Sequence, residues 1–347
     1  MSEYFISRIY PSDKHSLAQV DALLQKEGIT RDGNLDYICA MRDEDGGVIA
    51  TGSCFGPTLR CFAVSSDHQG EGLLNEIITH LMEVQFARGN THLFLYTKTA
   101  SAKFFESLGF YEIARVDGTL VFMENRKNGF GSYLKALEKT KTDGVSAALV
   151  MNANPFTLGH RYLVETAAAQ CGTLHLFVLS EDASLVPFSV RKKLVQAGTA
   201  HIPNVILHDS GPYIISNATF PSYFLKDAAA VIEGHARLDL AVFIRIARAL
   251  GVTARFVGEE PTSQVTGLYN EIMARELPKA GIACHIIPRL AVNGRAISAS
   301  TVRQALQQGD WDTLGTLVPD STLAYFQSPE AAPVLARIRN AGNVVHY

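Results

Sequence analysis

The chain has 347 residues, which is more than one small domain needs and about right for two domains. Hydrophobic residues make up 47% and charged residues 19%, the balance of a soluble globular protein with a sizeable core. The formal net charge of −3 offers no general attraction to nucleic acid or anionic lipid, so a polyanion-binding role is disfavoured.

The first residues, MSEYFISRIYPSDKHS, contain no signal-peptide apolar region, and no stretch approaches the roughly 18 apolar residues of a membrane helix. We therefore expect a cytoplasmic protein that does not bind a membrane. The five cysteines are an odd, dispersed set without a CxxC pair. This pattern favours reduced, mostly buried thiols over disulfides or a zinc site, and no metal-ligating set is expected.

The first third of the chain predicts a mixed α/β sheet, because short apolar strands alternate with two or three helices. The expected strands are 4–10, 37–42, 48–55, 59–64, 92–97 and 119–124. The stretch 125–143, NRKNGFGSYLKALEKTKTD, is polar, Gly-containing and Lys-rich. It predicts a linker that carries one connecting helix.

A glycine turn stands between a strand and a helix at residues 59–73, LRCFAVSSDHQGEGL. It resembles the pyrophosphate-binding turn of the GNAT acetyltransferases, in which Q/RxxGxG/A presents backbone N–H groups to coenzyme A. Gly70 and Gly72 match that pattern, whereas Asp67 stands where the family has Gln or Arg. Phe104 and Phe105 lie near the place where a GNAT Tyr often acts as general acid, so free N-acetyltransferase activity is not expected.

From residue 144 the pattern changes to apolar strands separated by helix-length segments. The expected strands are 147–152, 174–180, 204–209, 254–260 and 284–289. Strands that are apolar on both faces predict a parallel, doubly wound sheet of Rossmann-like type. No internal repeat is visible, so the two halves are expected to be different folds.

The turn 153–160, ANPFTLGH, lies where the first of these strands gives way to a helix. Ligands of doubly wound sheets bind at such ends, where helix N-termini present N–H groups to anions. Pro155 is expected to fix the chain and Gly159 to let a phosphate approach the backbone. His160 could carry a proton and Thr157 could donate a hydroxyl. Taken alone, the histidine is more simply an ordinary helix-start residue.

TLGH at 157–160 looks like the HxGH/TxGH signature of the nucleotidylyltransferase superfamily, and its usual partner, ISSTxxR, is similar to ISASTVR at 297–303. Ala299 stands where the family commonly has Ser, and Ser300 where it has Thr. Hydroxyls at a helix start cap N–H groups or donate to phosphate, and Arg303 offers a planar fork for phosphate oxygens. ISAS alone could be no more than a helix cap, but the ordered pair favours a nucleotide site.

Longer stretches resemble one branch of that superfamily, the [citrate (pro-3S)-lyase] ligases, which carry a GNAT-like domain in front. The stretches are NANPFTLGHRYLVE, VPFSVRKKLV, YIISNATFPSYFLK, LDLAVFIRIARALGVTARFVGEEP and ISASTVR. The resemblance implies a GNAT-like domain at 1–125, a linker at 126–143 and a nucleotidylyltransferase-like ATP-binding domain with C-terminal helices at 144–347.

The family resemblance also implies an activity. The enzyme would activate acetate with ATP and Mg²⁺ as acetyl-adenylate, then acetylate the thiol on the coenzyme A-like prosthetic group of the citrate lyase acyl-carrier subunit, releasing AMP and pyrophosphate. Both steps need positioning and charge stabilisation more than a protein nucleophile. Mg²⁺ would bind mainly through substrate phosphates.

The resemblance assigns catalytic roles to Thr157, His160 and Arg303. The expected nucleotide-binding and coenzyme-binding residues are Asn154, Pro155, Phe156, Gly159, Arg191, Gly258, Glu259, Ser298, Ser300, Thr301, Gly70 and Gly72. Glu259 and Glu260 could instead form a solvated acidic turn. Of Arg191, Lys192 and Lys193, at least one is expected to reach phosphate and the other two to form a solvated basic face. Residues 213–224, YIISNATFPSYF, would wall the acid or carrier-arm site, or simply pack as a surface loop.

Two questions stay open at the level of sequence. The GNAT-like domain could cradle the carrier's prosthetic group, or be a degenerate fold kept for docking or stability. The alternatives for the whole chain are an adenylyltransferase for a phosphorylated cofactor precursor, and a GNAT acetyltransferase with a nucleotide-sensing second domain.

Overall fold

The computed structural model describes residues 4–214, 220, 228–260, 264–292, 295–342 and 344. Two compact units emerge from the contacts within the chain. The first unit is formed by residues up to 131 together with part of 221–241, and the second by 132–220 and 242 onward. The boundary falls inside the helix that we expected within 126–143, α4 (Gly129–Glu138), and inside the long helix α7 (Ala228–Leu250).

The described residues of the first unit form a seven-stranded sheet in the order β1-β2-β3-β4-β5-β7-β6. Its strands are β1 (Ile6–Ile9), β2 (Tyr37–Arg42), β3 (Val48–Phe55), β4 (Thr58–Val64), β5 (Phe94–Lys98), β6 (Tyr111–Val116) and β7 (Leu120–Glu124). Neighbours pair antiparallel, except that β4 and β5 run parallel and pair only at Thr58↔Phe94 and Leu59↔Leu95. All the strands predicted in this part of the sequence are present.

Helices cover this sheet through apolar faces that recur at helical spacing. They are α1 (Lys14–Lys26), α2 (Leu73–Ala87) and α3 (Ala102–Ser107), with short 3₁₀ turns at Ser66–His68 and Thr99–Ser101. Leu73, Ile77 and Leu81 of α2 are buried against β2, β3 and β5. Val20 and Leu24 of α1 belong to a smaller apolar cluster with Ile9, Ile38 and Cys61.

The second unit contains a five-stranded parallel sheet in the order β10-β9-β8-β11-β12, among the residues described. Its strands are β8 (Ser146–Met151), β9 (Thr173–Val178), β10 (Val205–Asp209), β11 (Val252–Gly258) and β12 (Ala283–Ile287). This order confirms the predicted doubly wound sheet. The first strand of this sheet in the sequence, β8, is central, and β9 and β10 follow it on one side. The next strand, β11, pairs with the other side of β8, so the switch point lies between β8 and β11.

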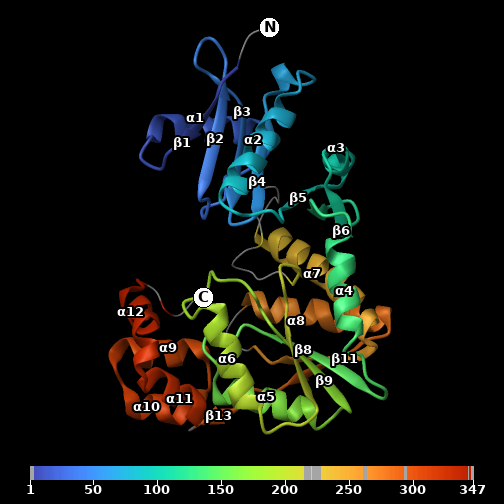
Figure 1. The fold of residues 1–347 in the computed structure, drawn as a ribbon, viewed down its shortest axis with the longest axis vertical. Coiled ribbons are helices and arrows are strands. Elements are labelled where there is room, and N and C mark those ends of the chain that lie inside the picture. Colours follow the sequence, from blue (N-terminus) through green and yellow to red (C-terminus); the bar gives the residue numbers. More distant parts are fainter. Residues whose placement is uncertain are drawn as a thin grey trace. The chain divides into compact units, whose positions relative to one another are not determined.

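The second unit's remaining elements join or cover these strands. They are α5 (Leu158–Ala168), α6 (Phe188–Thr199), α8 (Gln264–Glu276), a 3₁₀ turn (Leu277–Ala280), β13 (Ala291–Val292), β14 (Arg295–Ala296), α9 (Ala299–Gln308), α10 (Trp311–Leu317), α11 (Asp320–Gln327), a 3₁₀ turn (Pro329–Ala331) and α12 (Ala332–Asn340). Helices α9 to α12 gather at one end of this unit (red in Figure 1) and share its apolar core with α5, α6 and the sheet.

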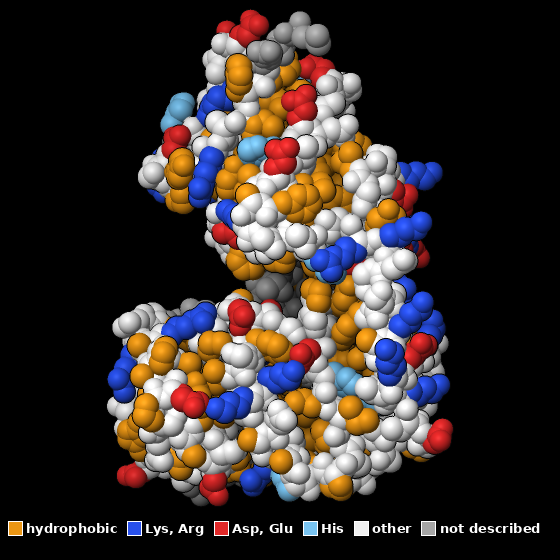
Figure 2. Space-filling view, in the orientation of Figure 1, with side chains coloured by type: hydrophobic (Ala, Val, Ile, Leu, Met, Phe, Trp, Pro, Cys, Tyr) orange, Lys and Arg blue, Asp and Glu red, His pale blue; other side chains and the backbone are white. Residues whose placement is uncertain are grey.

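The surface agrees with the composition. Basic and acidic side chains are interspersed over the face seen in Figure 2. In the part of the chain that the structure describes, no helix is both long and apolar enough to span a bilayer.

Candidate nucleotide site

The candidate site lies at the switch point of the parallel sheet. The turn 152–157 follows β8, and the strand beside it, β11, ends at Gly258 and is followed by Glu259 and Glu260. Helix α5 begins directly after the turn. Carboxyl ends of neighbouring parallel strands meet at one edge, so this is where a doubly wound sheet accommodates a ligand.

Thr157 and His160 form a reciprocal cap at the start of α5. The Thr157 Oγ1 accepts from the His160 backbone N–H at 3.2 Å, and the His160 Nδ1 accepts from the Thr157 backbone N–H at 3.1 Å. The Thr157 hydroxyl also lies 3.0 Å from Nδ1, and Thr157 is only 1% exposed. The contact of Thr157 with a ligand stays a prediction. Its hydroxyl is engaged inside the cap, and it positions the imidazole.

The same contacts fix the protonation of His160. Because Nδ1 accepts a backbone N–H, the neutral ring carries its proton on Nε2. Burial, together with the smaller effect of the nearby positive charge of Arg289, lowers the pKa of His160 to about 4. We expected a side chain able to carry positive charge, but in the ligand-free protein this imidazole is neutral at pH 7 and offers a single N–H donor.

The rest of the turn points inward. Ala153, Asn154, Pro155 and Phe156 are all buried, and Phe156 packs in the apolar core against Gly198, where a Cβ would come within 2.3 Å of its ring. The Asn154 Oδ1 accepts from the Val186 backbone N–H at 3.0 Å. These buried side chains shape the turn, and direct nucleotide binding by Pro155 and Phe156 stays a prediction.

One polar atom of the turn is left over. The Asn154 Nδ2 is buried and makes no hydrogen bond within the described structure. A buried amide donor without a partner is costly, so it is a natural point for a bound polar group.

Gly159 connects the two sequence motifs. A Cβ at this position would lie 3.2 Å from the Ile297 carbonyl oxygen and 3.5 Å from the Ile297 Cβ. The glycine therefore admits the backbone of the second motif, not a phosphate as we expected from the sequence. The starts of α5 and α9 are brought together at this contact, and each leaves first-turn N–H groups unpaired within its own helix.

Three hydroxyls cluster where α9 begins. The Ser298 Oγ accepts from the Thr301 backbone N–H at 3.1 Å and lies 2.8 Å from both the Ser300 Oγ and the Thr301 Oγ1. Ser298 and Ser300 are half-buried and Thr301 is exposed. All three were expected at the site, and each hydroxyl can rotate its proton toward an anion.

Two arginines expected to meet phosphate are instead buried under the turn. Arg303 is 2% exposed and donates to the carbonyl oxygens of Asn154 at 2.5 Å and Val344 at 2.7 Å. Arg191 is completely buried, and each of its guanidinium nitrogens donates to a carbonyl oxygen, including that of Asn152 at 2.9 Å. The sequence shows their charge but not their direction. In this structure both guanidinium groups hold the turn from inside, and their contact with phosphate stays a prediction.

The neighbours of Arg191 are surface residues. Lys192 pairs with Asp209 at 2.8 Å and Lys193 with Glu330 at 2.7 Å, both in exposed ion pairs. The expected basic face is thus present at these two positions only.

Arg289 is a site residue that the sequence analysis missed. It follows β12 by two residues, its Nε donates to the Glu259 carbonyl oxygen at 2.8 Å, and its guanidinium pairs with the Glu260 carboxylate. Gly258 accepts at its carbonyl from Asn270, 3.0 Å away. The Glu260 side chain is 15% exposed, so it is an ion-pair partner and not part of a solvated acidic turn, whereas Glu259 is exposed. The sequence signal that could have identified Arg289 is a Pro-Arg pair at the carboxyl end of a predicted parallel strand.

In the first unit, Gly70 and Gly72 adopt left-handed φ values of 91° and 82°, with no atom within 4 Å of a Cβ built at either. Gly72 caps α2. The turn also carries acidic side chains. Asp67 pairs with Lys26 at 2.8 Å, and Glu71, between the glycines, approaches His68 at 3.2 Å. The backbone suits a pyrophosphate, whereas the nearby carboxylates oppose one.

The remaining predictions concern the phenylalanine pair of the first unit, the segment 213–224 and metal binding. Phe105 is buried in the first unit's core beside Phe104 and Phe110. Of the segment 213–224, nearly all residues lie outside the part of the chain that is described. Among the described residues, no three His, Cys, Asp or Glu side chains are grouped closely enough to hold a metal ion.

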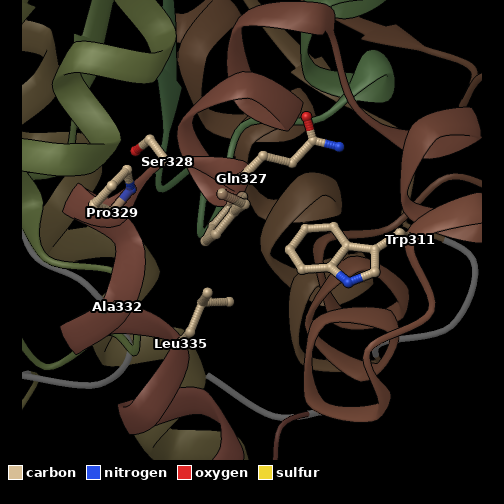
Figure 3. A pocket seen from close by; sticks show the side chains of 7 residues that line it. Trp311, Gln327, Ser328, Pro329, Ala332 and Leu335 are labelled. Carbon is tan, nitrogen blue, oxygen red and sulfur yellow. The ribbon is translucent and has the colours of Figure 1, made fainter.

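A separate, open surface pocket of about 550 Å³ lies among the C-terminal helices (Figure 3), with the indole of Trp311 on one side and Pro329 and Leu335 on the other. Its lining contains no residue of either motif. It is apolar and has no charged group, so it does not resemble a nucleotide site.

Comparison with known proteins finds relatives for both halves of the chain. Residues 146–326 match the family described as citrate lyase ligase C-terminal domain, and residues 4–110 match the acetyltransferase (GNAT) family. The chain is 40% identical over 330 residues to the [citrate [pro-3S]-lyase] ligase of Escherichia coli K12, covering 93% of each protein. It is 37% identical over 323 residues to that of Haemophilus influenzae, covering 91% of this chain and 96% of the relative. Among solved structures, Escherichia coli ElaA overlaps 36% of this chain and all of its own at 15% identity, with a TM-score of 0.32.

Proposed function

The chain belongs to the [citrate (pro-3S)-lyase] ligase family and is an enzyme, and from this membership we propose that it acetylates citrate lyase with ATP and acetate. In the first step an acetate oxygen attacks the α-phosphorus of ATP, giving acetyl-adenylate and releasing pyrophosphate. In the second, the thiol of the prosthetic group on the acyl-carrier subunit attacks the acetyl carbon. A thioester forms, AMP leaves, and the thiol proton is lost.

One observation supports the adenylation step above the others. The close approach of Gly159 to Ile297 joins two helix starts at the switch point of the parallel sheet. Together they present backbone N–H groups, the Ser298, Ser300 and Thr301 hydroxyls and the His160 Nε2–H, all of them donors. A surface rich in hydrogen-bond donors at paired helix N-termini suits a polyphosphate.

The proposed roles follow from these positions. His160 donates to a phosphate oxygen whose charge grows during transfer, and the α9 hydroxyls hold the departing pyrophosphate. Mg²⁺ would bridge ATP oxygens with few protein ligands. The first unit is proposed to receive the carrier's prosthetic group, because its glycine turn keeps the backbone of a coenzyme-binding loop.

The test is to incubate the protein with ATP, Mg²⁺, acetate and deacetylated citrate lyase. We expect AMP and pyrophosphate in equal amounts, with restored lyase activity, and no turnover when acetate is left out. Formation of ADP, or AMP that remains on a small-molecule product, would overturn the proposal. Consumption of acetyl-coenzyme A that survives His160→Ala would instead support an acetyltransferase.

A further inference from the structure

The residues beside the switch point include one cation that neither motif supplies. Arg289 is 25% exposed at its side chain, whereas Arg191 and Arg303 are buried and engaged with backbone carbonyls. Of these three arginines it is therefore the one whose side chain is partly exposed to solvent. The question is whether its position is compatible with a ligand at the two helix starts.

A short chain of contacts places Arg289 at the motif junction. Leu290, the next residue, accepts at its carbonyl from the Ile297 backbone N–H at 3.0 Å. Ile297 in turn packs against Gly159, next to His160. On its other side, Arg289 donates to the Glu259 carbonyl, directly after β11. The arginine thus lies between the end of β11 and the paired starts of α5 and α9. Its charge is also felt by His160, whose pKa it lowers.

We propose that Arg289 is the phosphate-binding arginine of this enzyme, and that Glu260 is a stand-in anion which holds its guanidinium until a polyphosphate takes its place. This rests on the proposed ATP-dependent function. A guanidinium recognises a carboxylate and a phosphate with the same planar fork, so one can replace the other without rebuilding the site. Arg303, which the family motif suggests for this role, is committed to holding the turn.

A phosphate-binding Arg289 and a purely structural ion pair predict different effects of substituting Arg289 and Glu260. If Arg289 and Glu260 merely tie the ends of β11 and β12 together, Arg289→Ala and Glu260→Gln should impair the enzyme in the same direction. If Glu260 competes with phosphate, the two substitutions should have opposite effects on polyphosphate affinity.

The experiment measures binding of inorganic pyrophosphate to the full-length protein by calorimetry, alongside the KM for ATP and for acetate. We expect Arg289→Ala to weaken pyrophosphate binding and raise the KM for ATP about 10- to 100-fold, with little change in the KM for acetate. We expect Glu260→Gln to tighten pyrophosphate binding a few-fold. Arg289→Lys should restore part of the affinity, since it keeps the charge but loses the fork.

Arg275→Ala is the matched control, because Arg275 also pairs with a neighbouring glutamate, Glu276 at 2.8 Å, on α8. It should leave pyrophosphate binding unchanged. Unchanged pyrophosphate binding in Arg289→Ala, or weaker binding in Glu260→Gln, would overturn the inference. If Arg289→Ala fails to fold, Glu260→Gln alone decides. A wild-type protein that binds pyrophosphate but forms no AMP would instead refute the proposed function.

Discussion

At the scale of single residues, His160 does two jobs with its two ring nitrogens. Nδ1 accepts the Thr157 N–H within the helix cap, and the proposed function uses Nε2–H as a donor to phosphate. The half-buried ring also stacks near Phe156, with centroids 5.9 Å apart and planes 16° apart. Replacing it therefore affects both folding and chemistry, and the two effects can be separated.

We predict that His160→Ala lowers the adenylation rate about 10²- to 10³-fold, because one preorganised donor is lost. It should also cost roughly 1 kcal/mol of stability through the lost cap contact. His160→Gln provides the control, since Gln at this helix position can still accept the Thr157 N–H as in a capping box. It should keep the stability but not the rate, as measured by urea unfolding and AMP release. Equal rates in wild type and His160→Ala would remove the assigned role.

The sequence predicted the position of the two motifs better than it predicted the contacts of their side chains. TLGH and ISASTVR correctly mark two adjacent helix starts. However, Thr157, Arg191 and Arg303 face inward, because carbonyl oxygens and N–H groups freed by an irregular turn need partners, and these side chains satisfy them. A sequence shows which residues can bind an anion but not that backbone groups have already engaged them.

At the scale of elements, the site depends on how closely α5 and α9 approach. That distance is set by Gly159, which lies in the first turn of α5 against the Ile297 carbonyl. The apolar strand runs in the sequence predicted the parallel sheet that carries these helices. They did not predict this contact, because it joins residues 138 positions apart through backbone packing alone.

We predict that Gly159→Ala impairs ATP binding, since its Cβ would lie 3.2 Å from the Ile297 carbonyl oxygen and must displace the start of α9. Gly315→Ala is the matched control. Gly315 also lies in a helix, α10, and its nearest neighbour would be 3.9 Å away. That change should add about 0.5 to 1 kcal/mol of stability without affecting ATP binding. An unaltered KM for ATP in Gly159→Ala would show that the helix spacing is not critical.

At the scale of the whole molecule, stability should depend on pH through buried histidines of the second unit. His208 on β10 lies 2.9 Å from His175 on β9, and burial together with His175 lowers the pKa of His208 to about 4. Burial lowers the pKa of His175 as well. With His160, these groups are neutral in the folded protein at a pH where the unfolded chain, with a histidine pKa near 6.5, binds protons.

Because the unfolded state then binds more protons, the free energy of unfolding should be constant above about pH 6.5 and fall as the pH drops from there to about 4. His208 alone contributes at most about 1.4 kcal/mol per pH unit over that range. Fluorescence of Trp311, the only tryptophan in the chain and part of the second unit, reports the unfolding. His208→Leu should make the dependence shallower, and an unchanged slope would contradict this account.

The proposed function makes the contact between Gly159 and Ile297 a condition for activity. A nascent polypeptide that has emerged only as far as α8, or one cleaved ahead of residue 297, holds the histidine turn but has nothing to close it against. We expect such a fragment not to hydrolyse ATP, because the two helix starts of the proposed phosphate site lie far apart in the sequence and are synthesised at different times.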